Sequence, residues 1–161
     1  MEIEMKIKGL MVDPVTNMPI VILKDERDER VLPIWVGIFE ANAIALRIEE
    51  IETPRPMTHD LLRNFLEALN VRVEKVVVSE LRDNTYFAQI HLDHNGSPQQ
   101  IDARPSDAIA LALRTEAPIF VEQAVLEQSR ALDEDGEPSD SERLRKWFEN
   151  LDPDDFSKYE M

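Results

Sequence analysis

The 161-residue sequence contains no cysteine, which excludes disulfides, zinc–thiolate sites and thiol nucleophiles. Glycine is scarce too: its 4 residues are isolated, so there is no Gly-rich phosphate-binding loop. No apolar run approaches the roughly 20 residues that span a bilayer, and the first residues lack the pattern of a secretory signal. We therefore expect a cytoplasmic protein that makes no membrane contact.

An excess of positive charge is also missing, because 18 basic residues face 33 acidic ones and the net charge is −15. Residues 131–161 hold 11 acidic and 4 basic residues, so the remaining 22 acidic and 14 basic residues leave 1–130 acidic as well. A field of this sign repels phosphate backbones. Nucleic-acid binding would therefore depend on a local basic surface or on bound cations.

What is present is a series of segments with strand or helix periodicity. Period-2 patterns and turn residues predict strands near 2–10, 19–23, 31–36, 71–81, 86–92, 99–103 and 118–121. Helical spacing predicts helices near 39–51, 58–69, 107–115 and, shorter, 122–128. Asn95-Gly96 is a strong hairpin signal, so the strands before and after it should pair. The prediction is a single α+β domain over 1–130, with a mixed, largely antiparallel sheet and three main helices.

Two further details can be tested against a structure. Pro33 should place its strand at a sheet edge or at a bulge, and Trp35 is expected in the core or an interface rather than as a base-stacking platform. On the second helix, an apolar stripe should face the core, comprising Leu61, Leu62, Phe65, Leu66 and Leu69.

The C-terminal 131–161 segment differs in composition from the rest of the chain. Residues 132–141 are acidic and contain glycine and proline, which predicts a disordered linker. Residues 141–151 could form a short amphipathic helix, with Leu144, Trp147, Phe148 and Leu151 on one side.

Two Arg-Pro corners stand out, each opening a helix. In the first, Asp102, Arg104 and Asp107 crowd Pro105, and Ser106 or Asp107 should cap the free amides of the helix. The second corner is the stretch Arg55-Pro56-Met57-Thr58-His59-Asp60, with Thr58 or Asp60 at the helix start. Because such corners present polar groups at element ends, we expect them to share one cleft.

With both corners in view, the sequence resembles the bifunctional nuclease domain family over roughly residues 5–130. The matching segments are 32–37 with Glu40-Ala41, 55–62, 102–112 and 117–119. The resemblance implies an α+β domain, a homodimer and nuclease activity on DNA and RNA. The acidic tail lies outside it.

Phosphodiester hydrolysis needs an activated water and neutralisation of charge on the phosphoryl oxygens, and carboxylate-bound Mg²⁺ or Mn²⁺ supplies both. The candidate metal ligands are Glu40, Asp60, Asp102 and Asp107. His59 is the candidate general base or ligand, and Arg55 and Arg104 could bind phosphate. The catalytic set is therefore predicted as His59, Asp60, Asp102, Arg104 and Asp107.

Each of these residues also has a purely structural interpretation. The acids could cap helices, and Arg104 could hold the corner by bridging Asp102 or Asp107. His59 could be a satisfied surface or helix-terminal imidazole. The alternative function is then a non-catalytic dimeric interaction or regulatory module, in which the Arg-Pro corners are structural.

Overall fold

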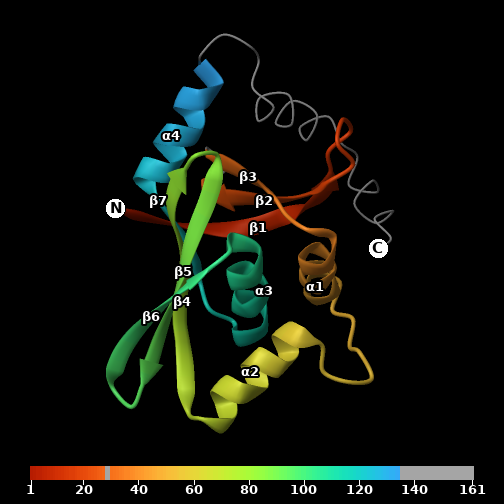
Figure 1. Ribbon diagram of the computed structural model, residues 1–161, viewed down its shortest axis with the longest axis vertical. Helices are drawn as coiled ribbons and strands as arrows, with labels where there is room; N and C mark the ends of the chain where they lie inside the picture. The colour runs from red at the N-terminus through yellow and green to blue at the C-terminus, as the bar shows by residue number, and fades with distance from the viewer. Residues whose placement is uncertain (28–29, 135–161) are drawn as a thin grey trace.

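The computed structural model describes residues 1–27 and 30–134. Its strands form one seven-stranded sheet in the order β3-β2-β1-β7-β4-β5-β6 (Figure 1). Neighbouring strands are antiparallel except for the parallel pair β4–β7. The strands are β1 (Glu2–Val12), β2 (Pro19–Asp25), β3 (Val31–Trp35), β4 (Val71–Arg82), β5 (Thr85–His94), β6 (Ser97–Ala103) and β7 (Ile119–Glu122). The predicted single α+β domain with a mixed, largely antiparallel sheet is confirmed.

Local turn chemistry explains why β4, β5 and β6 are neighbours. Asp83 and Asn84 join β4 to β5 with φ values of 51° and 60°, and Asn95 and Gly96 join β5 to β6 with φ values of 53° and 83°. Two consecutive residues with positive φ match the right-handed twist of the strands they connect. The hairpin predicted at Asn95-Gly96 is confirmed.

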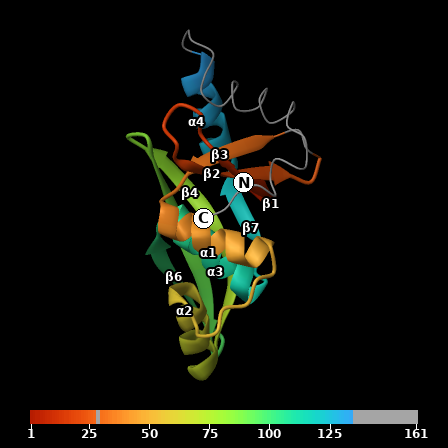
Figure 2. The same ribbon diagram turned by 90° about the vertical axis from the view of Figure 1, so that its right-hand side faces the viewer.

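Three helices gather on one side of the sheet: α1 (Ile38–Ile48), α2 (Thr58–Ala68) and α3 (Pro105–Thr115) (Figure 2). The most deeply placed of them, α3, packs on β4 and β5 with α1 and α2 against it. Its buried alanines (Ala108, Ala110 and Ala112) have short side chains, which let the neighbouring elements approach closely. The fourth helix, α4 (Gln123–Glu134), packs on β4 and β7.

The apolar stripe of α2 is where the structure departs most from expectation. Leu61, Leu62, Phe65 and Leu69 are 50%, 45%, 58% and 61% exposed, and only Leu66 packs partly against the core. The prediction of a core-facing stripe was therefore wrong for four of its five residues. Helical spacing identified an apolar face correctly but could not show what covers it.

Helix boundaries also differ from the predictions. The helix expected to run from 39 to 51 ends at Ile48, and Glu50 follows with φ of 55°. The helix expected at 122–128 runs to Glu134, so the first residues of the expected linker are helical. The remainder of the predicted tail, including the proposed 141–151 helix, lies outside the described residues.

At the far edge of the sheet, β3 carries Pro33, as predicted for an edge strand. Trp35 ends this strand, packs partly buried beside a small cluster of Met11, Ile20 and Ile22, and donates its indole N–H to Asp13 Oδ2 at 2.9 Å. Asp13 Oδ1 accepts the Val15 amide at 2.9 Å, so this nearly buried carboxylate organises the β1–β2 turn. Within 1–27 and 30–134, no helix combines the length and apolarity needed to span a membrane.

Candidate functional site

The first turns of α1, α2 and α3 meet at one place, and each carries a carboxylate as its third residue. These residues are Glu40, Asp60 and Asp107. The amino end of a helix carries partial positive charge and favours an acid in its first turn. The site is thus built on three helix starts, two of which follow the Arg-Pro corners.

His59 and Asp107 form the innermost pair of the site. His59 Nε2 lies 2.9 Å from Asp107 Oδ1, and His59 is only 7% exposed. Burial raises the pKa of Asp107, but the hydrogen bonds from His59 and Arg104 outweigh it and hold that pKa below its ordinary value. An ionised carboxylate can only accept, so Nε2 carries a proton, and in the neutral tautomer that this allows Nδ1 keeps its lone pair. This orientation is the one that a general base requires.

Arg104 closes the site on the solvent side. Its Nε and one terminal nitrogen donate to Asp107 Oδ2 at 3.0 and 2.8 Å, and the same terminal nitrogen donates to Glu40 Oε1 at 2.6 Å. Hydrogen bonds to Asp107 and then to Glu40 raise the pKa of the Arg104 guanidinium. Arg104 therefore ties α1 to the start of α3, bridging Asp107 and Glu40 rather than Asp102. With His59 neutral, the four side chains carry a formal charge of −1.

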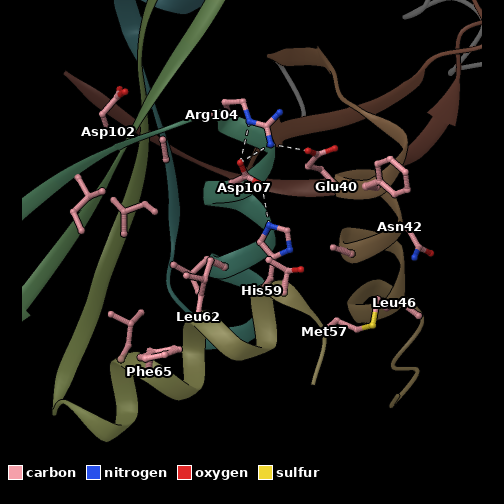
Figure 3. Close-up of a pocket in the computed structure, with 18 of the residues that line it drawn as sticks. Glu40, Asn42, Leu46, Met57, His59, Leu62, Phe65, Asp102, Arg104 and Asp107 are labelled. Carbon is pink, nitrogen blue, oxygen red and sulfur yellow. Dashed lines mark hydrogen bonds and ion pairs between the residues drawn. The ribbon is translucent and has the colours of Figure 1, made fainter. Parts of the chain in front are cut away.

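These four residues stand at one end of a cavity of about 730 Å³ that is otherwise largely apolar (Figure 3). Apolar walls come from α2 and the sheet, including Leu62, Phe65 and Ile90. Asp102, on β6, also lines the cavity, but its exposed carboxylate points away from the Arg104–Asp107 pair (Figure 3). Glu40, His59, Asp102, Arg104 and Asp107 thus share one cleft.

Asp60 and Arg55 lie elsewhere, although both were expected in the same cleft. Asp60 Oδ1 accepts from Arg114 Nε at 2.6 Å, and its Oδ2 accepts the Met57 amide at 3.0 Å. Burial raises the pKa of Asp60, yet the bonds from Met57 and Arg114 bring it below the ordinary value. Both Asp60 and Arg55 line a second cavity of about 240 Å³.

Arg114 was missed by the sequence analysis. It is 5% exposed and also donates to the carbonyl oxygens of Ala110 and Ala43 at 2.9 and 3.0 Å, so it joins all three helices. Its signal in the sequence was a single charged residue beyond the first turn of an alanine-rich helix, two turns after Asp107 and therefore on the same face.

Capping of α3 by Ser106 or Asp107, which the sequence predicted, does not occur. The N-cap residue is Arg104, and no side-chain cap hydrogen bond forms at the start of α3. Ser106 is buried, and the Asp107 carboxylate is engaged by His59 and Arg104. At α2, by contrast, Asp60 does accept an amide of the helix start.

The predicted metal ligands do not assemble into a metal site in the described part of the chain. There, no group of three or more His, Asp or Glu side chains is arranged to hold an ion. The Arg104 guanidinium occupies the space between Glu40 and Asp107, and Asp60 faces the other cavity. The donor set as it stands does not fit a resident divalent cation.

Comparison with known proteins shows which family this chain resembles. The family model described as the bifunctional nuclease domain matches residues 21–134. An uncharacterized protein of Mycobacterium tuberculosis (strain H37Rv) is 38% identical over 162 residues, covering 95% of this chain and 97% of that protein. Bifunctional nuclease 1 of Arabidopsis thaliana is 27% identical and that of Oryza sativa subsp. japonica 25% identical, each over 116 residues and 70% of this chain.

The chain spans only about a third of these plant proteins, since the matched regions cover 36% and 35% of their lengths. The matched region contains both Arg-Pro corners, all three helix starts and the pair His59–Asp107. The resemblance predicted from the sequence motifs is therefore confirmed. The chain belongs to the bifunctional nuclease domain family.

Proposed function

We propose that the protein is a nuclease that hydrolyses phosphodiester bonds in DNA and RNA with low sequence specificity. The observation that carries the proposal is the buried His59–Asp107 pair, capped by Arg104 at the mouth of the larger cavity. Family membership and the names of the plant relatives support the same activity.

In this proposal His59 is the general base. Its Nδ1 removes a proton from the water that attacks phosphorus, the P–O bond to one sugar oxygen breaks, and that oxygen takes a proton from solvent; Asp107, as a positioning residue, fixes the tautomer and stabilises the imidazolium that forms. Arg104 binds a phosphoryl oxygen, for which its planar guanidinium is suited once it releases one of its two carboxylates. Asp102 lies at the edge of the same cavity and is retained in the proposed site.

The use of Mg²⁺ or Mn²⁺ stays a prediction from the sequence, as does a cytoplasmic location. The two carboxylates and one guanidinium at the cavity mouth sum to a formal charge of −1, so a polyanionic substrate requires positive charge from another source. The activity assay must therefore include these cations and a chelator.

A direct assay tests the proposal. Purified protein is incubated with supercoiled plasmid and with RNA, in Mg²⁺, in Mn²⁺ and in EDTA. We expect cleavage of both substrates and a loss of about 10²- to 10⁴-fold in His59→Gln, the range that a general base contributes. His94→Gln, an exposed histidine beside the β5–β6 turn, is the matched control and should keep full activity.

Circular dichroism must show that the inactive variant is folded. No cleavage under any condition, or equal cleavage by wild type and His59→Gln, would refute the nuclease assignment and leave the non-catalytic dimeric module as the better explanation.

We also propose that the protein is a homodimer, formed through the exposed apolar face of α2. Four large apolar side chains lie 45% to 61% exposed on this one helix, and contiguous apolar patches on soluble proteins usually mark an interaction surface. A second copy is the occupant that family resemblance suggested. Light scattering after size exclusion should give twice 18.6 kDa.

Charged substitutions can separate the dimer without touching the cavity. Leu61 and Leu69 belong to the exposed face but do not line the larger cavity. The variant Leu61→Glu/Leu69→Glu should be monomeric, whereas Val15→Glu, at an 85% exposed turn position, should stay dimeric. A monomeric wild type over the whole concentration range contradicts the proposal.

A further inference from the structure

The smaller cavity is lined by an unusual concentration of arginine. Arg47 comes from α1, Arg55 from the loop between α1 and α2, Arg63 from α2 and Arg114 from α3. Two prolines, Pro54 and Pro56, stiffen that loop, which runs from α1 to α2 in Figure 2. Four guanidinium groups are thus brought together by four separate segments of the chain.

The charge of this cavity is opposite to that of the protein. Its lining contains four arginines and two carboxylates, Glu52 and Asp60, for a formal charge of +2 in a chain whose net charge is −15. Asp60 already accepts from Arg114 and from the Met57 amide. Glu52 is exposed, so water screens its charge. The positive charge of the arginines is therefore only partly neutralised by the protein and attracts an anion that enters the cavity.

Two arginines of this cavity are only partly engaged by the residues that the structure describes. Arg47 Nε is buried and has no hydrogen-bond acceptor among the residues the structure describes. Arg63 makes a long contact, 3.4 Å, to the side chain of its neighbour Asn64. A buried donor without an acceptor is costly, so the Arg47 side chain would gain from an acceptor, either water or an anion, that enters the cavity. Arg114, whose guanidinium has three protein acceptors, instead forms the rigid wall.

We propose that this cavity binds a phosphate group. Planar guanidinium groups match the geometry of phosphoryl oxygens and hold them with charge-assisted hydrogen bonds. Its volume of about 240 Å³ is below the range of about 300–1,000 Å³ typical of cavities that enclose whole small molecules. The ligand is accordingly a phosphate, free or on a nucleic-acid strand, with any attached sugar and base left outside.

The position of this site connects it to the larger cavity. Leu46 lines both cavities, and the consecutive residues His59 and Asp60 face one each. A strand anchored by one phosphate among the arginines would place a neighbouring phosphodiester near His59. This last assignment, to a nucleic-acid strand, rests on the proposed function, whereas phosphate binding itself does not.

Calorimetric titration of the full-length protein tests the site with three probes at low salt. They are inorganic phosphate, a short 5′-phosphorylated oligonucleotide with hydrolysis-resistant phosphorothioate linkages, and the same oligonucleotide with a 5′-hydroxyl. We expect saturable binding of inorganic phosphate, weakened by about tenfold or more in Arg55→Gln/Arg63→Gln. Arg72→Gln/Arg82→Gln, which removes the same charge from exposed positions on β4, is the matched control and should bind like wild type.

The probes also distinguish the source of the phosphate. If the 5′-phosphorylated strand binds more tightly than its 5′-hydroxyl form, the ligand of the cavity is a terminal phosphate. If both strands bind equally, and more tightly than inorganic phosphate, the ligand is a phosphate of the backbone. Equal weakening in the two double variants, or no saturable binding of inorganic phosphate, overturns the proposal. Because no probe needs to be cleaved, these outcomes are independent of whether the protein is a nuclease, and unfolding followed by circular dichroism confirms that both variants are folded.

Discussion

Replacement of Arg114 by leucine tests how the three helices are held together. Arg114 is 5% exposed and bonds to Asp60 on α2, to Ala43 on α1 and to Ala110 on its own helix. Leucine fills part of the space but donates no hydrogen bond. Asp60 then keeps the Met57 amide and loses its counterion.

The expected cost follows from the geometry of the pair. Removing one partner of a buried ion pair costs about 3–5 kcal/mol. The Asp60 side chain is still 17% exposed, so water can partly solvate the remaining carboxylate. The carbonyl oxygens of Ala110 and Ala43 lie within helices, where backbone amides also serve them. We therefore expect the lower end, about 3 kcal/mol, a loss that a domain with about 5–15 kcal/mol of total stability can survive.

Urea unfolding followed by circular dichroism measures this loss. Arg72→Leu is the control: its side chain is 72% exposed and pairs only with surface acids, so the free energy of unfolding should change by less than about 1 kcal/mol. A loss below about 1 kcal/mol in Arg114→Leu, with an unchanged urea dependence, would refute the view that this side chain joins the helices.

The pH dependence supplies a second check on the same pair. The pKa of Asp60 is lowered in the folded protein, so its stabilising contribution is present above the unfolded pKa of about 4 and is lost as pH falls through the folded pKa. The stability difference between wild type and Arg114→Leu should therefore be constant near neutral pH and shrink below about pH 4.

Two further predictions concern other parts of the chain. Trp35→Phe removes the indole N–H donated to Asp13 and should lower the free energy of unfolding by about 1 kcal/mol at pH 7, measured with urea. Because that hydrogen bond is the main cause of the lowered Asp13 pKa, this loss should diminish below about pH 4. An unchanged loss at that pH contradicts the assignment. Truncation after Glu134, the end of α4 and of the family match, should leave a domain that unfolds cooperatively at an unchanged urea midpoint, and loss of the transition would place Trp147 and Phe148 in the core.

Local signals in the sequence were sufficient for most of the fold. Asn95-Gly96 fixed a hairpin because few residue pairs tolerate positive φ at both positions. Asn70 follows α2 in the left-handed conformation with φ of 57°, which asparagine tolerates better than most residues. These features depend on neighbours in the chain, which a sequence displays directly.

Features that depend on distant partners were predicted less well. The face of α2 was assigned to the core because periodicity shows that a face is apolar but not what covers it. Asp107 was expected at an amide, but a buried imidazole and a guanidinium compete for it more strongly. The role of Arg114 required knowing that Asp60 lies across from it on another helix, 54 positions earlier in the chain.

The two successive residues at the start of α2 face different partners on α3, and this has a consequence for the alignment of the helices. A shift of α2 by one residue in one direction would set Asp60 against Asp107 and Leu61 against Arg114, and a shift in the other direction would set Thr58 against Asp107 and His59 against Arg114. The first shift would bring two carboxylates together and leave the buried Arg114 without its carboxylate, and the second would also take the carboxylate away from Arg114. Electrostatics therefore selects a single rotational setting for a helix whose outward apolar surface does little to specify one.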